Sequence, residues 1–263
     1  MDLIEGRASP PDTEAELKVL ADRYRNAGGA GIDLLNLLGG QAESMLDRLP
    51  GPVRSGLDEA TARALREATK AAHYSRGVVG DQKSWLNSAA GAAMGAVGGM
   101  GGLPTALAEL PVTTTLLLRV IQGVAAEYGF DPDEENVRFD CIAVFSAAGP
   151  LSDDDGADLA FISARVALTG PAVKGIIARV APRLATVLGQ KLAAQAVPVL
   201  GAVAGAATNY AYTSYYQEMA HVHFGLRRLA IEADVPLDDL TDRLRIVLSN
   251  PNDDVTNRHR RPD

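Results

Sequence analysis

The sequence predicts an all-α fold, a multi-helix bundle with Gly/Ala-rich central helices and no significant β-sheet. Apolar residues recur at helical spacing, as in Leu17, Leu20, Ala21 and Tyr24. No stretch shows the two-residue alternation of a half-exposed strand, and the valines lie among alanines rather than in β-branched runs. The chain has 263 residues, of which 47% are hydrophobic, and its single apolar middle without a linker favours one domain.

Ten helices are expected in order along the chain. The first follows the Thr-x-x-Glu spacing of Thr13 and Glu16, which is typical of a capping box at a helix start. The same apolar periodicity continues to the last helix, and proline predicts a kink or a restart at Pro111 and at Pro182. The expected ranges are 12–26, 31–49, 57–75, 83–99, 104–128, 134–148, 153–168, 172–196, 199–232 and 237–248.

The charge pattern bears on the kind of partner. A formal net charge of -8 argues against a generic nucleic-acid-binding surface, because neutralising phosphates needs an excess of Lys and Arg. However, no Asp or Glu occurs from Leu159 to Gln217. A helix with a cationic edge is expected there; it would either attract anionic lipid headgroups, by about 1 kcal/mol per basic residue, or be an ordinary solvated face. The candidate lipid contacts are Lys174, Arg179, Arg183 and Lys191.

No cofactor or metal site is expected. The single cysteine, Cys141, excludes an intrachain disulfide and any multi-cysteine metal site. The glycine-rich run 98–102 lacks the Lys-Ser/Thr pair of a phosphate-binding loop. The acidic run Asp153–Asp155 is interpreted as the first turn of a helix capped by Ser152, where carboxylates stabilise the positive end of the helix dipole. An acidic chain start without an apolar run favours a cytoplasmic location over secretion.

Two uncharged stretches raise the question of a membrane. Ser84–Ala108 and Leu192–Gln217 are each long enough to cross a bilayer as a helix, but glycine and alanine replace many large apolar residues. Three interpretations stay open: a spanning helix, a buried hairpin of a soluble core, and reversible association with a membrane interface. Small residues at four-residue spacing permit close helix packing. The expected packing glycines are Gly91, Gly95, Gly99, Gly201 and Gly205.

Candidate catalytic side chains are few. Glu109 is the lone carboxylate of an apolar run, and we expect it to face the interior near Arg119, because an isolated buried charge is costly. The alternative is that both are exposed. Glu218 and His221 share a helix face, as a carboxylate-oriented general base requires, whereas His221 and His223 point to different sides and do not form a metal-binding pair.

Several separated motifs occur in order along the chain. They are Gly98–Pro104, Ala108–Thr114, Leu118–Arg119, Glu127–Pro132, Ala196–Ala202 with Gly205 and Asn209–Tyr210, and an aromatic-rich helix that ends at Arg227 and Arg228. Together they resemble the EcsC family, named for a protein encoded beside the subunits of an ABC transporter. The resemblance extends over residues 60–232. It implies a link to transport and secretion, and it implies no defined reaction, cofactor or catalytic residue.

The predicted organisation has three parts: a helical lead-in over residues 1–55, an EcsC-like helical domain over 56–248, and a disordered tail over 249–263. The resemblance, the uncharged stretches and the local basic excess predict a non-enzymatic, membrane-associated accessory protein. It would be cytoplasmic or peripheral at the inner membrane face. Its expected partners are membrane lipid or a membrane transporter.

Two alternatives stay open. A soluble hydrolase acting on a lipid or a peptide would use Glu109, Arg119 and His221, and these side chains would have to converge in a pocket. A soluble helical scaffold would instead bind another protein through the C-terminal helix.

Overall fold

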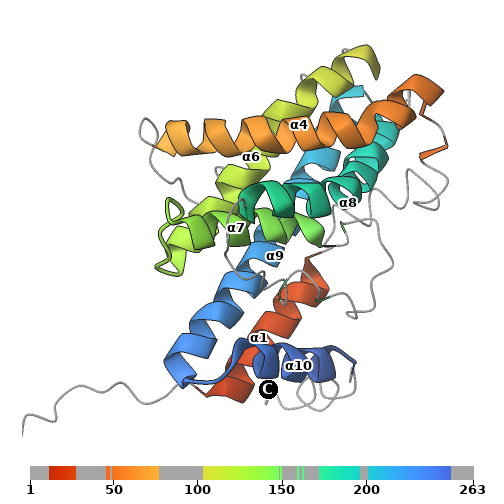
Figure 1. Cartoon of the computed structure of the whole chain (residues 1–263). Coiled ribbons are helices and arrows are strands. Elements are labelled where there is room, and N and C mark those ends of the chain that lie inside the picture. Colours follow the sequence, from red (N-terminus) through yellow and green to blue (C-terminus); the bar gives the residue numbers. More distant parts are fainter. Residues whose placement is uncertain are drawn as a thin grey trace, which may run out of the picture.

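The computed structural model describes residues 12–27, 46–47, 49–76, 103–147, 149, 159, 162, 172–195 and 201–249. Helices account for most of these residues, and no strand occurs among them, so the predicted all-α fold is confirmed (Figure 1). The helices are α1 (Thr13–Asn26), α4 (Gly51–Arg76), α6 (Leu103–Glu127), α7 (Glu135–Ala143), the 3-10 helix η1 (Val144–Ser146), α8 (Ala172–Gln195), α9 (Gly201–Ala233) and α10 (Leu237–Ser249).

Helix α9 packs against most of the other described helices (Figure 1). Helices α6 and α8 and the short η1 pack against it, and α1 and α10 lie beside its C-terminal half. Most side chains from Ala211 to Leu226 are buried, and the other three, Ser214, Gln217 and Glu218, are half-buried on one side of the helix. A helix buried over most of its circumference belongs in the centre of a fold, and this part of α9 lies there.

Helix α4 lies across α6 and α8. Its buried positions follow helical spacing and form one apolar stripe, which the sequence pattern predicts. The approach to α8 is close at Gly189, where a Cβ would lie 2.6 Å from Leu57 Cδ2 of α4. The buried residues of the stripe are Leu57, Thr61, Ala64, Leu65 and Ala68.

Helices α1 and α10 pack against each other as well as against α9. Arg25 Nη2 donates a hydrogen bond to the carbonyl oxygen of Val247 at 2.7 Å, and Arg243 forms an ion pair with Glu14. Each helix buries one apolar stripe. The stripes are Leu17, Leu20, Ala21 and Tyr24 in α1, and Leu237, Leu240, Leu244 and Leu248 in α10.

Several predicted boundaries are confirmed and some are corrected. The expected helices over 12–26, 104–128, 172–196, 199–232 and 237–248 match α1, α6, α8, α9 and α10 to within two residues at each end. Helix α4 begins six residues before the expected start, at Gly51 instead of 57, and the expected helix over 134–148 is divided into α7 and η1. The expected helices over 31–49, 83–99 and 153–168 fall largely outside the described residues.

The helix restarts predicted at Pro111 and Pro182 do not occur. Pro111 lies inside the continuous helix α6, and Pro182 lies inside the continuous helix α8. An internal proline costs about 3 kcal/mol, and burying apolar side chains on both sides of it, at roughly 2 kcal/mol each, more than offsets that cost. The cap of α1 is also displaced by one residue: Asp12 Oδ1, rather than Thr13, accepts from Glu14 N and Ala15 N at 3.2 Å.

The uncharged stretches are only partly described. Residues 84–102 lie outside the description, and residues 103–108 begin α6. Of the second stretch, residues 192–195 end α8 and residues 201–217 begin α9, and residues 196–200 lie outside the described residues. None of the described helices combines the length and the apolar content that crossing a bilayer requires.

Candidate functional site: polar clusters on opposite sides of α9

The C-terminal half of α9 carries polar side chains on two opposite faces. Glu218, His221 and Gly225 lie at i, i+3 and i+7 and share one face. His223 and Arg227, at i and i+4, share the other. The expectation that Glu218 and His221 lie together, with His223 on a different side, agrees with these positions.

The first cluster, called here the His221 cluster, joins three helices. Arg23 of α1 forms an ion pair with Glu218, with 2.8 Å between Nη1 and Oε2. His221 Nε2 lies 4.0 Å from Oε2 of Glu127, the last residue of α6. The ring of Tyr128 meets the His221 ring edge-on, with centroids 5.7 Å apart. The side chain of His221 is only 10% exposed, whereas Arg23 and Glu127 are 38% and 46% exposed, so the imidazole is covered and the charged groups around it reach the surface.

Burial shifts the pKa of two members of the cluster, His221 and Tyr128. Desolvation, followed by the positive charge of Arg23, lowers the pKa of His221 below its usual 6.5, although Glu218 and Glu127 oppose the shift. Burial also raises the pKa of Tyr128, against the opposing effect of Arg23. His221 is therefore a neutral imidazole at neutral pH, held between two carboxylates and one guanidinium.

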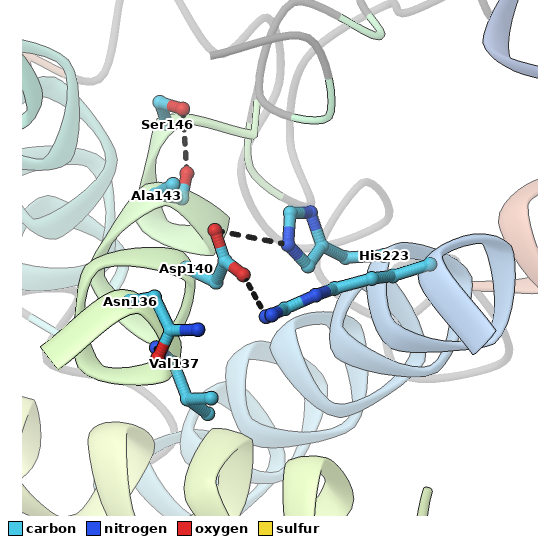
Figure 2. Close-up of polar contacts among 7 residues, drawn as sticks. Asn136, Val137, Asp140, Ala143, Ser146 and His223 are labelled. Carbon is cyan, nitrogen blue, oxygen red and sulfur yellow. Dashed lines mark hydrogen bonds and ion pairs between the residues drawn. The ribbon is translucent and has the colours of Figure 1, made fainter. Parts of the chain in front are cut away.

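The second cluster, called here the Asp140 cluster, joins α7 to α9 (Figure 2). Asp140 Oδ1 lies 3.8 Å from His223 Nε2, and Asp140 Oδ2 accepts a hydrogen bond from Arg227 Nη1. The guanidinium of Arg227 also stacks over the Phe130 ring, 4.4 Å from its centroid. Arg227 thus combines an ion pair with a cation–π contact, and its planar guanidinium can stack flat on the ring while its N–H groups donate in the plane, a geometry that a compact ammonium lacks.

Buried hydroxyl groups continue along α9 from the Asp140 cluster. Tyr212 and Tyr216 are almost fully buried, and within the described part of the chain their hydroxyl groups have no hydrogen-bond partner. Burial raises the pKa of both phenols. Tyr215 differs, because its hydroxyl oxygen accepts a hydrogen bond from Gly149 N at 3.1 Å.

A comparison with known protein families identifies a match. The model of the EcsC protein family matches residues 54–229. The chain belongs to the EcsC family. No curated protein and no solved structure matches it significantly.

The EcsC match covers only part of the helical assembly. It runs from the first turn of α4 to the last turns of α9, so it includes Glu127, Asp140, His221 and Arg227. Helices α1 and α10 lie outside it. Arg23, the one member of the His221 cluster from α1, is therefore supplied from outside the matched part of this EcsC protein.

The three candidate catalytic residues do not form one described site. His221 lies in the cluster, where the charged groups that act on it are Arg23, Glu218 and Glu127. Arg119 is not among them and lies eight residues before Glu127, about 12 Å along α6. The side chain of Glu109 lies outside the description. The expected proximity of Glu109 and Arg119 is wrong, because the continuous α6 separates them by about 15 Å of helical rise.

The described part of the EcsC protein offers no metal-binding constellation. No group of three His, Cys, Asp or Glu side chains is placed there to hold an ion. The acidic run at Asp153–Asp155 and its expected cap, Ser152, lie outside the described residues. The His221 cluster contains no serine, threonine or cysteine, so it lacks a hydroxyl or thiol nucleophile.

The candidate lipid contacts differ in exposure. Lys174 and Arg179 are exposed on α8, and Arg183 is half-buried. Lys191 does not share that surface: it is 2% exposed, and its Nζ donates to Thr113 Oγ1 at 3.3 Å. Lys191 is buried because it lies on the side of α8 that faces α6.

The role of the expected packing glycines stays a prediction. Gly201 and Gly205 lie in the first two turns of α9, and Gly91, Gly95 and Gly99 lie outside the described residues.

Sequence reasoning missed the partners of the two histidines. Asp140 stands in the run Val137–Phe145, where most residues are apolar and buried. A charged residue within such a run requires a partner, and this signal could have identified it. The sequence around Arg23 and Glu127 gives no comparable signal, because each lies on a helix face that also carries other polar residues.

Proposed function

We propose that this EcsC protein is an accessory protein that acts at an anionic membrane surface, in association with a transport or secretion apparatus. The observation that supports the lipid contact most directly is the exposed face of α8. Lys174 and Arg179 are exposed at the two edges of that face, and no acidic residue occurs anywhere in α8. The link to transport rests on family membership alone.

The opposite side of α8 anchors it in the protein. Val180, Leu184 and Leu188 are completely buried, as the amphipathic pattern predicts. Because this apolar stripe packs in the core, α8 would not insert into acyl chains while the protein stays folded. Contact with a membrane would therefore be electrostatic and confined to the headgroups.

The size of the attraction makes the contact reversible. Each basic residue near an anionic surface contributes about 1 kcal/mol, so Lys174 and Arg179 together contribute about 2 kcal/mol, or roughly a thirtyfold change in partitioning. An attraction of this origin weakens as salt shortens the Debye length. Stable residence at a membrane would need a second contact, which a transporter partner would supply.

Vesicle flotation of the full chain tests the lipid contact. We expect flotation with vesicles that contain phosphatidylglycerol, no flotation with phosphatidylcholine alone, and release by salt. The double variant Lys174→Glu/Arg179→Glu should stay at the bottom of the gradient. The matched control is Arg63→Glu/Arg66→Glu, which makes the same change of net charge at exposed positions of α4 and should float like the unmodified protein.

Two outcomes would contradict the proposed lipid contact. One is equal flotation of the two double variants, which would mean that net charge rather than α8 governs binding. The other is an unmodified protein that ignores anionic vesicles. In that case the protein-interaction scaffold becomes the better interpretation, and crosslinking in native cell membranes would identify the partner.

A further inference from the structure

Helix α1 covers the face of α9 that contains His221. Leu20 of α1 reaches the backbone of α9 at Gly225, where a Cβ would lie 2.7 Å from Leu20 Cδ2. Arg23, one turn further along α1, pairs with Glu218, seven residues before Gly225 on the same face of α9. His221 lies between these two contacts. The cover over the imidazole is shared between α1 and Tyr128, whose ring follows α6, meets the His221 ring edge-on and also lies against the Gly225 position.

Each helix at this interface presents charge toward His221. Arg23 comes from α1, Glu127 from the end of α6, and Glu218 from α9 itself. Within the described part of the chain, α10 also packs against α9 but presents no charge that acts on His221. Of these groups, Arg23 alone opposes a positive charge on the imidazole, and it is the one that leaves if α1 moves away.

We propose that α1 is a proton-sensitive clasp on α9, docked while His221 is neutral and released when His221 takes up a proton. Protonation would place an imidazolium next to Arg23 in a covered site, and both effects disfavour the docked arrangement. Release of α1 would expose His221 to water, remove Arg23 and leave Glu127 and Glu218 to stabilise the new charge. This inference is independent of the proposed lipid contact, which concerns α8.

The sign of the pH dependence follows from linkage. With α1 docked, burial and Arg23 hold the pKa of His221 below 6.5, and with α1 released both effects are lost. The released state therefore binds the proton more tightly. Docking is strongest above pH 6.5 and weakens as the pH falls from 6.5 through the pKa of the docked state. Because release takes up one proton, the equilibrium constant for docking can fall by at most about tenfold for each pH unit.

Release would present two complementary surfaces. Helix α1 would expose its apolar stripe, which includes Leu17 and Leu20, and α9 would expose the notch at Gly225. The α9 surface would suit an amphipathic helix with a leucine and, three residues later, an arginine, as Leu20 and Arg23 are spaced. A partner helix of that pattern would compete with α1, and acid would favour the competitor.

Hydrogen exchange of the full chain tests the clasp. A released helix of 14 residues is only marginally stable, so α1 amides should lose protection when docking fails. We expect protection of residues 13–26, corrected for intrinsic exchange, to fall between about pH 7.5 and about pH 5.5. Amides of α8 serve as an internal reference and should keep their protection.

Two histidine variants separate the clasp from general acid sensitivity. His221→Gln cannot take up the proton, so protection of α1 should become independent of pH in this range. His223→Gln changes the other buried histidine of α9, which lies on the opposite face, and should behave like the unmodified protein. Equal protection of α1 at both pH values in the unmodified protein, or an unchanged pH effect in His221→Gln, would overturn the proposal.

A second measurement does not depend on how well the histidine variants fold. Leu20→Ala weakens the contact of α1 with α9 and leaves His221 in place. We expect an NMR titration to show a higher pKa of His221 in Leu20→Ala than in the unmodified protein. An identical pKa would mean that α1 does not control this histidine, and the clasp would be rejected.

Discussion

Gly149 lies against Val187 of α8 in a contact that only glycine permits. A Cβ on Gly149 would be 2.7 Å from Val187 Cγ2, and the φ of Gly149 is +94°. The backbone of the same residue donates to the Tyr215 hydroxyl oxygen, so this residue joins α8 to α9. The branched Val187 side chain has little freedom to move away.

Gly149→Ala is therefore expected to destabilise the protein by about 2–4 kcal/mol, combining left-handed strain with overpacking. The matched control is Gly175→Ala in α8, where no atom lies within 4 Å of the new Cβ and a gain of up to about 1 kcal/mol is expected. Denaturant unfolding of both variants measures the difference. Equal stability of the two would show that the contact with Val187 relaxes without cost.

Arg227→Lys should not behave as a conservative change. A lysine keeps the charge near Asp140 but loses the planar stacking over Phe130, and we expect a loss of about 1–2 kcal/mol in unfolding free energy. Arg228→Lys is the control, because that side chain is exposed and pairs with Glu232 of its own helix. Its change should stay within about 0.5 kcal/mol. Similar losses in both variants would contradict a special role for the stacked guanidinium.

The three neighbouring tyrosines of α9 should respond differently to removal of the hydroxyl group. Tyr212→Phe and Tyr216→Phe remove buried hydroxyl groups without a partner among the described residues, so they should be neutral or stabilise by up to about 1 kcal/mol. Tyr215→Phe leaves Gly149 N without its acceptor and should cost about 1–3 kcal/mol. Thermal unfolding compares them. Marked destabilisation by Tyr212→Phe would indicate that an internal water satisfies its hydroxyl group.

Alkaline pH should unfold the protein through the same buried phenols. Burial raises the pKa of Tyr212 and Tyr216 above the ordinary value of 10.0, so the fold favours the neutral forms. Their contribution to stability is complete below pH 10 and is lost as the pH rises above it. The unfolding free energy, measured from about pH 9 to about pH 11, should fall less steeply in the double variant Tyr212→Phe/Tyr216→Phe. Parallel curves would contradict this prediction.

The helices were predictable where their periodicity was strong. Helix α8 runs from Ala172 to Gln195, against an expected 172–196, because Val180, Leu184 and Leu188 mark a continuous stripe. Proline was a poor indicator of where these helices end. Its local cost is read easily from the sequence, whereas the compensating burial on both sides of Pro182 depends on packing partners elsewhere in the chain.

The site was predictable only within one helix. Spacing placed Glu218 with His221 and separated His223 from them, and the structure agrees. The partners Arg23 and Asp140 lie 195 and 87 residues from the α9 side chains they pair with. No local pattern encodes such pairings, because they depend on how the helices assemble. The burial of Lys191 was missed for the same reason: its sequence neighbours do not reveal that its side of α8 faces α6.

The packing of α1 and α10 on α9 determines how a truncated form of this chain would behave. A fragment cut to the family-matched residues 54–229 would lose both helices and the end of α9. The α9 surface that now receives Leu20 at Gly225 would then meet water, and an apolar surface uncovered in this way promotes aggregation. The family-matched range is therefore shorter than the part of the chain that this protein needs to cover its apolar core.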